Sequence, residues 1–294
     1  MKVLKFGGSS VGSVTGLHNI KKIAEGADQP LIIVVSALGG ITDKLIALGK
    51  RAGAGDVAYI GDLDAIIRRH LDLVKTEIAE EKQAALMTDL EALFHDLRSI
   101  LHGVYLIQDL TQKTADAIVA FGERLSSLIV AAFIDDAKHY DSRTLFKTTR
   151  QGDKHLVDYD LTNKNILDNF AHHQGIAVMG GFIATDAVTG ATTNLGRGGS
   201  DFTAAILAAA LNAEVLEIWT DVDGFMTADP RVISTAYTID ELTYGEAMEL
   251  CNFGAKVVYP PTIYPVCEKH PHPYQEYLEP HGEGQHYSCQ GGKQ

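Results

Sequence analysis

The 294-residue sequence predicts a layered α/β fold with a mostly parallel central sheet. Four short apolar runs are typical of strands that are buried on both faces of such a sheet. These runs cover residues 3–6, 31–37, 176–184 and 215–222. Segments with helical periodicity separate them, and the resulting order of strands and helices is that of a layered α/β domain.

Three of the expected helices follow from local patterns. Residues 56–78 carry apolar side chains at helical spacing, and a second amphipathic stretch continues to about residue 107. The first stretch contains Leu63, Ile66, Ile67, Leu71, Val74 and Ile78, and the second contains Leu86, Leu90, Leu93, Leu97 and Leu101. Thr238 and Glu241 have the spacing of a capping box, which predicts a helix from about residue 239 to residue 251.

The C-terminal segment 271–294 has a different composition. Because Leu278 is its only aliphatic residue, we expect this tail to be poorly ordered.

The composition excludes several classes of protein. Hydrophobic residues make up 46% and charged residues 21% of the chain, which is unlike a disordered or a membrane-spanning protein. The net charge of −13 argues against nucleic acid and anionic membranes as partners. The three cysteines form no C-x-x-C pair, and the N-terminal apolar stretch is too short for a signal peptide. We therefore expect a location in the reducing cytoplasm.

Glycine-rich corners follow the first two predicted strands. The segment KFGGSSVG, residues 5–12, places Lys5 before Gly7 and Gly8, and residues 34–45 carry Ser36, Gly39, Gly40 and Thr42. Glycines let backbone amides approach phosphate oxygens, and ligands bind beyond the carboxyl ends of parallel strands. The alternative interpretation is a pair of unrelated turns with a surface lysine.

Two further segments carry charged groups in apolar or glycine-rich surroundings. The segment NLGRGGSD, residues 194–201, precedes a helix of small residues, so Arg197 can bind a carboxylate or phosphate while Ser200 or Asp201 caps the helix. The alternative is a flexible loop with a good cap. Glu123 lies on a helical face of small and apolar residues. Its carboxylate could pair with Arg124 or with another neighbour in the protein. Alternatively, it could bind a cationic group of a ligand.

A longer polar segment combines carboxylates, a hydroxyl group and cations. Residues 218–231 and 253–261 supply Thr220, Asp221, Asp229, Arg231 and Lys256, a mixture suited to a nucleotide with its divalent metal. A polar loop with Asp-Pro turn chemistry is the alternative. None of the chemical segments contains histidine, and no histidines have metal-ligand spacing, so neither Ser-His catalysis nor a protein metal site is predicted.

Taken together, the motifs KFGGSSV, VVSALGGITD, FGERLSS, GFIA, NLGRGGSD and WTDVDGFMTADPR resemble, in order and spacing, the catalytic domain of aspartokinases in the amino acid kinase family. The resemblance covers residues 1–270, with a helical insertion at about 56–107 that is similar to the aspartokinase part of bifunctional aspartokinase/homoserine dehydrogenases. It implies a three-layer α/β/α sandwich, the amino acid kinase fold. The ACT regulatory domains that follow in such proteins are expected to be absent.

The resemblance also implies a reaction. ATP and Mg²⁺ would phosphorylate the β-carboxylate of L-aspartate to 4-phospho-L-aspartate, the first step of the pathway to lysine, threonine and methionine. The acceptor carboxylate is already ionised near neutral pH, so no general base is required. The chemical demand is electrostatic, because two anions must be brought together and the charge on the phosphoryl oxygens neutralised.

Carried over by motif, the resemblance assigns roles to individual residues. Lys5, Gly7 and Gly8, with Asp201, would form the catalytic set that holds the transferring phosphoryl group. Ser36 and Thr42 would lie near the substrate side chain, Glu123 would bind the α-ammonium group, and Arg197 with Ser200 the α-carboxylate. The nucleotide site would consist of Thr220, Asp221, Phe225, Asp229, Arg231 and Lys256. Phe225 and Met226 replace the aliphatic-tyrosine pair usual in the family, which affects the contacts expected with adenine.

Two alternatives remain at this point. The chain could phosphorylate glutamate, N-acetylglutamate, carbamate or a nucleoside monophosphate on the same fold, although Glu123 argues against an acceptor without an ammonium group. It could also be an inactive truncated binding module, against which the joint presence of Lys5, Glu123, Arg197 and Asp201 speaks. L-Aspartate and ATP are the expected partners, and a homo-oligomer stays open because the sequence does not determine oligomeric state.

Overall fold

The computed structural model describes residues 1–152, 154–220, 224–229, 231–255, 259, 264–268, 278–280 and 286–290. Its central sheet has the strand order β10-β11-β9-β1-β2-β6-β3. These strands are β1 (Lys2–Phe6), β2 (Leu31–Val35), β3 (Ala137–Tyr140), β6 (Ile176–Gly180), β9 (Val215–Trp219), β10 (Leu278–Pro280) and β11 (His286–Gln290). The five strands from β9 to β3 pair in parallel, and β10 and β11 pair antiparallel at one edge. The predicted α/β fold with a mostly parallel sheet is confirmed.

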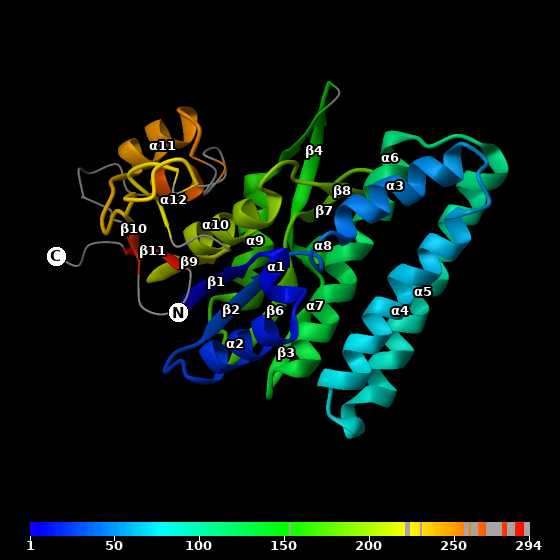
Figure 1. Ribbon diagram of the computed structural model, residues 1–294, viewed down its shortest axis with the longest axis horizontal. Helices are drawn as coiled ribbons and strands as arrows, with labels where there is room; N and C mark the ends of the chain where they lie inside the picture. Colours follow the sequence, from blue (N-terminus) through cyan, green and yellow to red (C-terminus); the bar gives the residue numbers. More distant parts are fainter. Residues whose placement is uncertain are drawn as a thin grey trace.

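Helices cover both faces of this sheet (Figure 1). Successive residues of β2 alternate between two hydrophobic cores, because side chains of a strand point to opposite faces in turn. Leu31, Ile33 and Val35 belong to the first core, and Ile32 and Val34 belong to the second. The helices of the first core include α2 (Val14–Glu25), α3 (Ile41–Gly53) and α7 (Phe121–Phe133), and those of the second include α9 (Tyr159–Phe170) and α10 (Gly199–Leu211).

A second, four-stranded sheet overturns one detail of the strand prediction. It consists of β5 (Lys154–Val157), β4 (Lys147–Gln151), β7 (Ile183–Asp186) and β8 (Thr192–Asn194), in that order. The expected single strand at 176–184 is therefore wrong, since β6 and β7 belong to different sheets. The chain turns at Gly181 and at Phe182, whose φ is 66°. A Cβ at Gly181 would lie 2.6 Å from the Ser200 Cα atom, so only glycine allows the chain to pass α10 here.

Two long antiparallel helices occupy the stretch where a helical insertion was expected. They are α4 (Tyr59–Glu77) and α5 (Glu80–Ile107), and they lie side by side along one end of the molecule (Figure 1). Their apolar faces bury the periodic leucines and isoleucines of the first core. Between them His70 is fully buried, and burial lowers its pKa to about 4. The shorter helices α1 (Gly8–Val11) and α6 (Gln112–Val119) also contribute to the first core, whereas α8 (Ser142–Leu145) contributes Leu145 to the second.

The C-terminal region corrects a helix boundary. The predicted helix at 239–251 begins later, as α11 (Tyr244–Asn252), because the capping box is formed by Thr243 and Glu246. The Thr243 amide donates to Glu246 Oε2 at 2.8 Å, whereas Thr238 forms a β-bridge with Met226. A short helix α12 (Tyr264–Glu268) follows.

The expected poorly ordered tail at 271–294 falls mainly outside the described residues, and β10 and β11 are the parts of it that the structure describes. Its order and the domain boundary at about residue 270 therefore stay predictions. Among the described residues, no helix combines the length and the apolar character that crossing a membrane would need.

Candidate active site

The two glycine-rich corners after β1 and β2 are joined by backbone hydrogen bonds. The Ser36 amide donates to the Phe6 carbonyl at 3.2 Å, and the Gly39 amide donates to the Gly8 carbonyl at 2.8 Å. A Cβ at Gly8 would lie 2.7 Å from the Ala37 carbonyl oxygen, so the close contact requires glycine. The two corners thus form one surface beyond the carboxyl ends of neighbouring parallel strands, where ligands of open α/β sheets bind.

The third glycine-rich segment reaches this surface from the opposite face of the sheet. Gly198, with a φ of 67°, precedes the first turn of α10, which contains Asp201. Asp201 Oδ1 lies 2.7 Å from Lys5 Nζ, and the two side chains are 13% and 10% exposed. The start of α10 and the end of β1 are therefore held together by an ion pair at the site.

A cavity of about 280 Å³ lies where these segments meet. Its lining residues are Lys5, Ser36, Thr42, Glu123, Phe182, Gly196, Gly198, Gly199, Ser200 and Asp201. Six of the residues that the sequence singled out are in this set: Lys5, Ser36, Thr42, Glu123, Ser200 and Asp201. Gly7 and Gly8 adjoin it, since they continue β1 directly after Lys5, and the Gly7 amide donates to the Trp219 carbonyl at 3.1 Å.

Glu123 brings an unusual carboxylate into this cavity. Its side chain is 3% exposed, and its Oε1 atom accepts a hydrogen bond of 3.1 Å from the Ala37 amide. Its buried Oε2 atom accepts no hydrogen bond from any described residue. Burial raises the Glu123 pKa to about 7, because water no longer solvates the charged form. A ligand that carries an ammonium group would supply the partner that Oε2 lacks.

Pairing of Glu123 with Arg124, one of the two alternatives raised by the sequence, does not occur. The Arg124 guanidinium instead lies over the ring of Phe121, 4.5 Å from its centroid. The two charges point apart because consecutive helical residues project about 100° from one another.

Not every expected substrate contact lies at the cavity. Arg197 is exposed and does not line it, so its role toward an α-carboxylate stays a prediction. Phe182, in contrast, lines the cavity although sequence analysis did not single it out as a site residue. Two consecutive glycines, Gly180 and Gly181, interrupt the apolar run before it, and such an interruption is a signal for a bend or a close backbone approach.

The expected nucleotide residues are only partly described. Thr220 directly follows β9 and is half-buried, next to the corner formed by Gly7. Phe225 is 1% exposed within the second core, and Arg231 Nη2 pairs with Asp229 Oδ2 at 2.7 Å. Asp221 and Lys256 lie outside the described residues. The nucleotide roles of all six stay predictions.

Arg69 of α4 supplies a contact that the sequence did not suggest. Its Nη1 atom donates a hydrogen bond of 2.7 Å to the Gly39 carbonyl. Its Nη2 atom would lie 3.2 Å from a Cβ placed at Gly12. The guanidinium therefore lies against both glycine-rich corners and ties the α4–α5 pair to the site. An amphipathic helix contains many exposed arginines, so periodicity alone does not single out this one.

Comparison with known proteins identifies the family. The family model described as "Amino acid kinase family" matches residues 1–272. The chain belongs to the amino acid kinase family. It is 34% identical over 278 residues to Aspartokinase 1, chloroplastic, of Arabidopsis thaliana, which covers 90% of this chain and 48% of that protein. It is 33% identical over 271 residues to Lysine-sensitive aspartokinase 3 of Escherichia coli, covering 90% of this chain and 58% of that protein.

Solved structures of family members agree with the fold. E. coli aspartokinase III in complex with aspartate and ADP superposes with a TM-score of 0.80 at 31% identity, over 92% of this chain and 60% of that chain. The aspartate kinase of Clostridium acetobutylicum gives a TM-score of 0.77 at 25% identity, over 91% of this chain and 58% of that chain. The chain thus spans about half to three-fifths of the length of these relatives. The predicted resemblance to aspartokinases and the amino acid kinase fold are confirmed.

Proposed function

We propose that this amino acid kinase phosphorylates the β-carboxylate of L-aspartate with ATP, giving 4-phospho-L-aspartate and ADP. The observation that carries the proposal is the pairing of two features in one cavity. Lys5 offers a cation at the end of β1, and Glu123 offers a buried carboxylate oxygen without a partner. A small dianionic acceptor that also carries an ammonium group fits both. The similarity to aspartokinases supports the same substrate.

The acceptor would be held at three points. Glu123 Oε2 would accept a hydrogen bond from the α-ammonium group, and this contact would stabilise the ionised form of Glu123. Ser200, at the start of α10, would donate to the α-carboxylate with Arg197, which the glycines on either side leave free to move. Ser36 and Thr42 would lie beside the β-carboxylate. The acceptor needs no general base, since that carboxylate is ionised near neutral pH.

Lys5 and the backbone amides near Gly7 and Gly8 would neutralise charge on the transferring phosphoryl group. Asp201 holds the ammonium group of Lys5 at 2.7 Å, so the cation is in place before any phosphate arrives. When the protein forms no covalent bond with the substrate, stabilisation of the transition state by pre-positioned charges is the main source of catalysis.

Mg²⁺ would enter with the nucleotide. This ion is usually held by one or two carboxylates together with substrate phosphates, not by a cage of protein ligands. Asp201 is a carboxylate in the cavity and fits that requirement. When bound, Mg²⁺ would neutralise charge on the phosphate oxygens.

By analogy with its relatives, the reaction would begin the pathway to lysine, threonine and methionine. We propose the cytoplasm as its location, on the grounds of cysteine usage.

A single assay separates this proposal from its alternatives. ADP release is measured with L-aspartate, L-glutamate and N-acetyl-L-glutamate, and hydroxylamine is added to trap the acyl phosphate as a hydroxamate. We expect ADP and hydroxamate in equal amounts with L-aspartate alone. Turnover of N-acetyl-L-glutamate in preference to aspartate would contradict the role of Glu123. Absence of turnover with every acceptor, in a folded protein, would favour the inactive binding module.

A further inference from the structure

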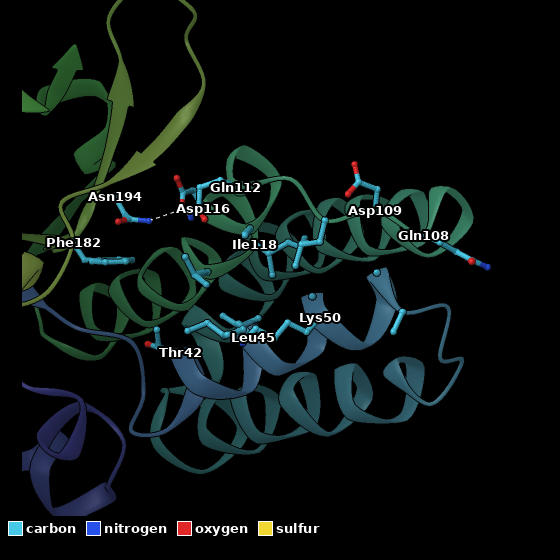
Figure 2. A pocket seen from close by; sticks show the side chains of 17 residues that line it. Thr42, Leu45, Lys50, Gln108, Asp109, Gln112, Asp116, Ile118, Phe182 and Asn194 are labelled. Carbon is cyan, nitrogen blue, oxygen red and sulfur yellow. Dashed lines mark hydrogen bonds between the residues drawn. The ribbon is translucent and has the colours of Figure 1, made fainter. Parts of the chain in front are cut away.

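A second and larger cavity, of about 690 Å³, lies between α3 and α6 (Figure 2). Gly49 and Gly53 of α3 are four residues apart, so they lie on one face of the helix, where a Cβ atom would come within 3.4 Å and 3.1 Å of Leu110. The walls are mainly apolar and include Leu45, Ile46, Leu110, Ala115, Ile118 and Val119. A cavity of this size and lining is typical of sites for small organic molecules.

One carboxylate in this cavity is buried and only partly satisfied. Asp116 of α6 is 8% exposed, and its Oδ1 atom accepts two hydrogen bonds, at 2.7 Å from Gln112 Nε2 and at 2.8 Å from Asn194 Nδ2. Figure 2 shows these three side chains together at one side of the cavity, opposite Leu45 and Lys50 of α3. The Asp116 Oδ2 atom accepts no hydrogen bond from any described residue. Burial raises the Asp116 pKa, whereas the hydrogen bonds from Gln112 and Asn194 and the nearby His155 act in the opposite direction.

The lining of this cavity has a net negative charge. Its charged residues are Asp109, Asp116 and Lys50, which give a net charge of −1. Asp109 and Lys50 are exposed at the rim, where water solvates them. Asp116 is therefore the buried charged residue of the lining, and its Oδ2 atom can pair with a cation in the cavity.

We infer that this cavity is a binding site for a small molecule with an apolar body and a single ammonium group. The ammonium group binds Oδ2 of Asp116, and the apolar body packs against the leucine, isoleucine and valine side chains of α3 and α6. The site is distinct from the acceptor pocket, but the two share Thr42 and Phe182 as lining residues. An occupant would thus lie directly beside the proposed aspartate site.

The test uses 4-phenylbutylamine as the probe, with 4-phenylbutan-1-ol and 4-phenylbutyrate as neutral and anionic analogues of the same shape. Binding to the full chain is followed by NMR with labelled isoleucine δ1-methyl groups. We expect saturable binding of the amine with a Kd of about 1 mM or tighter, as for ligands of this few atoms. Shifts should concentrate at Ile46 and Ile118, which line the cavity, and leave Ile206 of the second core unchanged.

The charge requirement is tested with matched variants. Asp116→Asn should weaken amine binding by about tenfold to a hundredfold, the effect of losing one charge-assisted hydrogen bond. Asp109→Asn, a change of the same kind at the exposed rim, should alter the Kd by less than about twofold. Thermal unfolding of both variants shows whether the fold is retained. Comparing the affinities of the wild-type protein for the amine and the alcohol tests the charge requirement without any mutation.

Equal affinity for the amine, the alcohol and the butyrate would overturn the inference. The same holds for equal effects of the two substitutions, for methyl shifts away from the cavity, or for no saturable binding. Because none of these measurements uses ATP or aspartate, their failure would leave the proposed kinase function untouched.

Discussion

Lys5 at the end of β1 and Asp201 in the first turn of α10 form an ion pair of 2.7 Å, although they are 196 positions apart in the sequence. Both side chains are nearly buried, so their charges are screened less than those of surface pairs. The pair fixes the lysine ammonium group at the point where the glycine-rich corners meet. Because Asp201 holds the Lys5 ammonium group, this positive charge has a fixed position that does not depend on a ligand.

Removal of Lys5 should act mainly on the chemical step. Lys5→Ala should lower kcat by about 10²- to 10³-fold, the usual cost of losing one donor that stabilises the transition state, and should change the aspartate KM less. Lys2→Ala is the matched control, because Lys2 lies on the same strand and pairs with Glu217 at 3.5 Å near the surface. Steady-state kinetics on both variants checks this. An unchanged kcat in Lys5→Ala, with a raised KM for ATP, would mean that Lys5 only binds nucleotide.

Aspartate binding should depend on pH through Glu123. Burial raises its pKa to about 7, so below that pH the carboxyl group is mainly protonated and cannot pair with an ammonium group. The aspartate KM should therefore fall by up to about tenfold between about pH 6 and pH 8, and binding near pH 6 should release a proton. In Glu123→Gln the aspartate KM should be flat over this range. A wild-type KM that is also flat would show that the Glu123 ionisation is not linked to substrate.

Arg69 should act as a positioning residue for the second glycine-rich corner. Loss of its hydrogen bond to the Gly39 carbonyl in Arg69→Ala should lower kcat/KM by about tenfold, since one hydrogen bond from a charged donor contributes about 1.5 kcal/mol. Arg69→Lys should restore part of the activity. Arg68→Ala serves as the control, because Arg68 is the exposed neighbour on α4. If Arg69→Ala lowers the melting temperature but leaves kcat/KM unchanged, Arg69 has a structural role alone.

His70 should make the fold sensitive to acid. Its pKa is about 4 when folded and near 6.5 when exposed, so the unfolded chain binds a proton between these values and the folded chain does not. The stabilisation from keeping this histidine neutral is complete above about pH 6.5 and is lost as the pH falls toward about 4. Between about pH 6.5 and pH 5 the free energy of unfolding should drop by about 2 kcal/mol through His70. Urea unfolding of His70→Leu should lack this part of the drop, and an identical pH dependence in both proteins would refute it.

Much of the fold and of the site could be predicted from local sequence. Buried strands carry continuous apolar runs, and β1, β2 and β9 begin within one residue of where such runs begin. The glycine-rich corners were recognisable because close backbone approach requires glycine, and Gly8 indeed packs against the Ala37 carbonyl. The break between β6 and β7 was missed, since an apolar run does not reveal that its two halves belong to different sheets.

What local sequence could not supply was contact between distant segments. Glu123 has an apolar helical face in sequence, but only its burial against Ala37 shows that one oxygen lacks a partner. The contact of Arg69 with Gly39 likewise depends on how α4 packs against the corner. The helix after residue 238 illustrates the limit of motifs, because two Thr-x-x-Glu pairs lie five residues apart and only the second forms the cap.

The most direct test of the central claim compares L-aspartate with succinate, which has the same two carboxylates and no ammonium group. The quantity measured is the ratio of kcat/KM for the two acceptors, in the wild type and in Glu123→Gln. We predict a wild-type ratio of at least about tenfold in favour of aspartate, from one charge-assisted hydrogen bond to Glu123. The ratio should fall toward one in Glu123→Gln, with kcat for aspartate largely retained. The same ratio in both proteins would contradict the assignment of the cavity as the aspartate site.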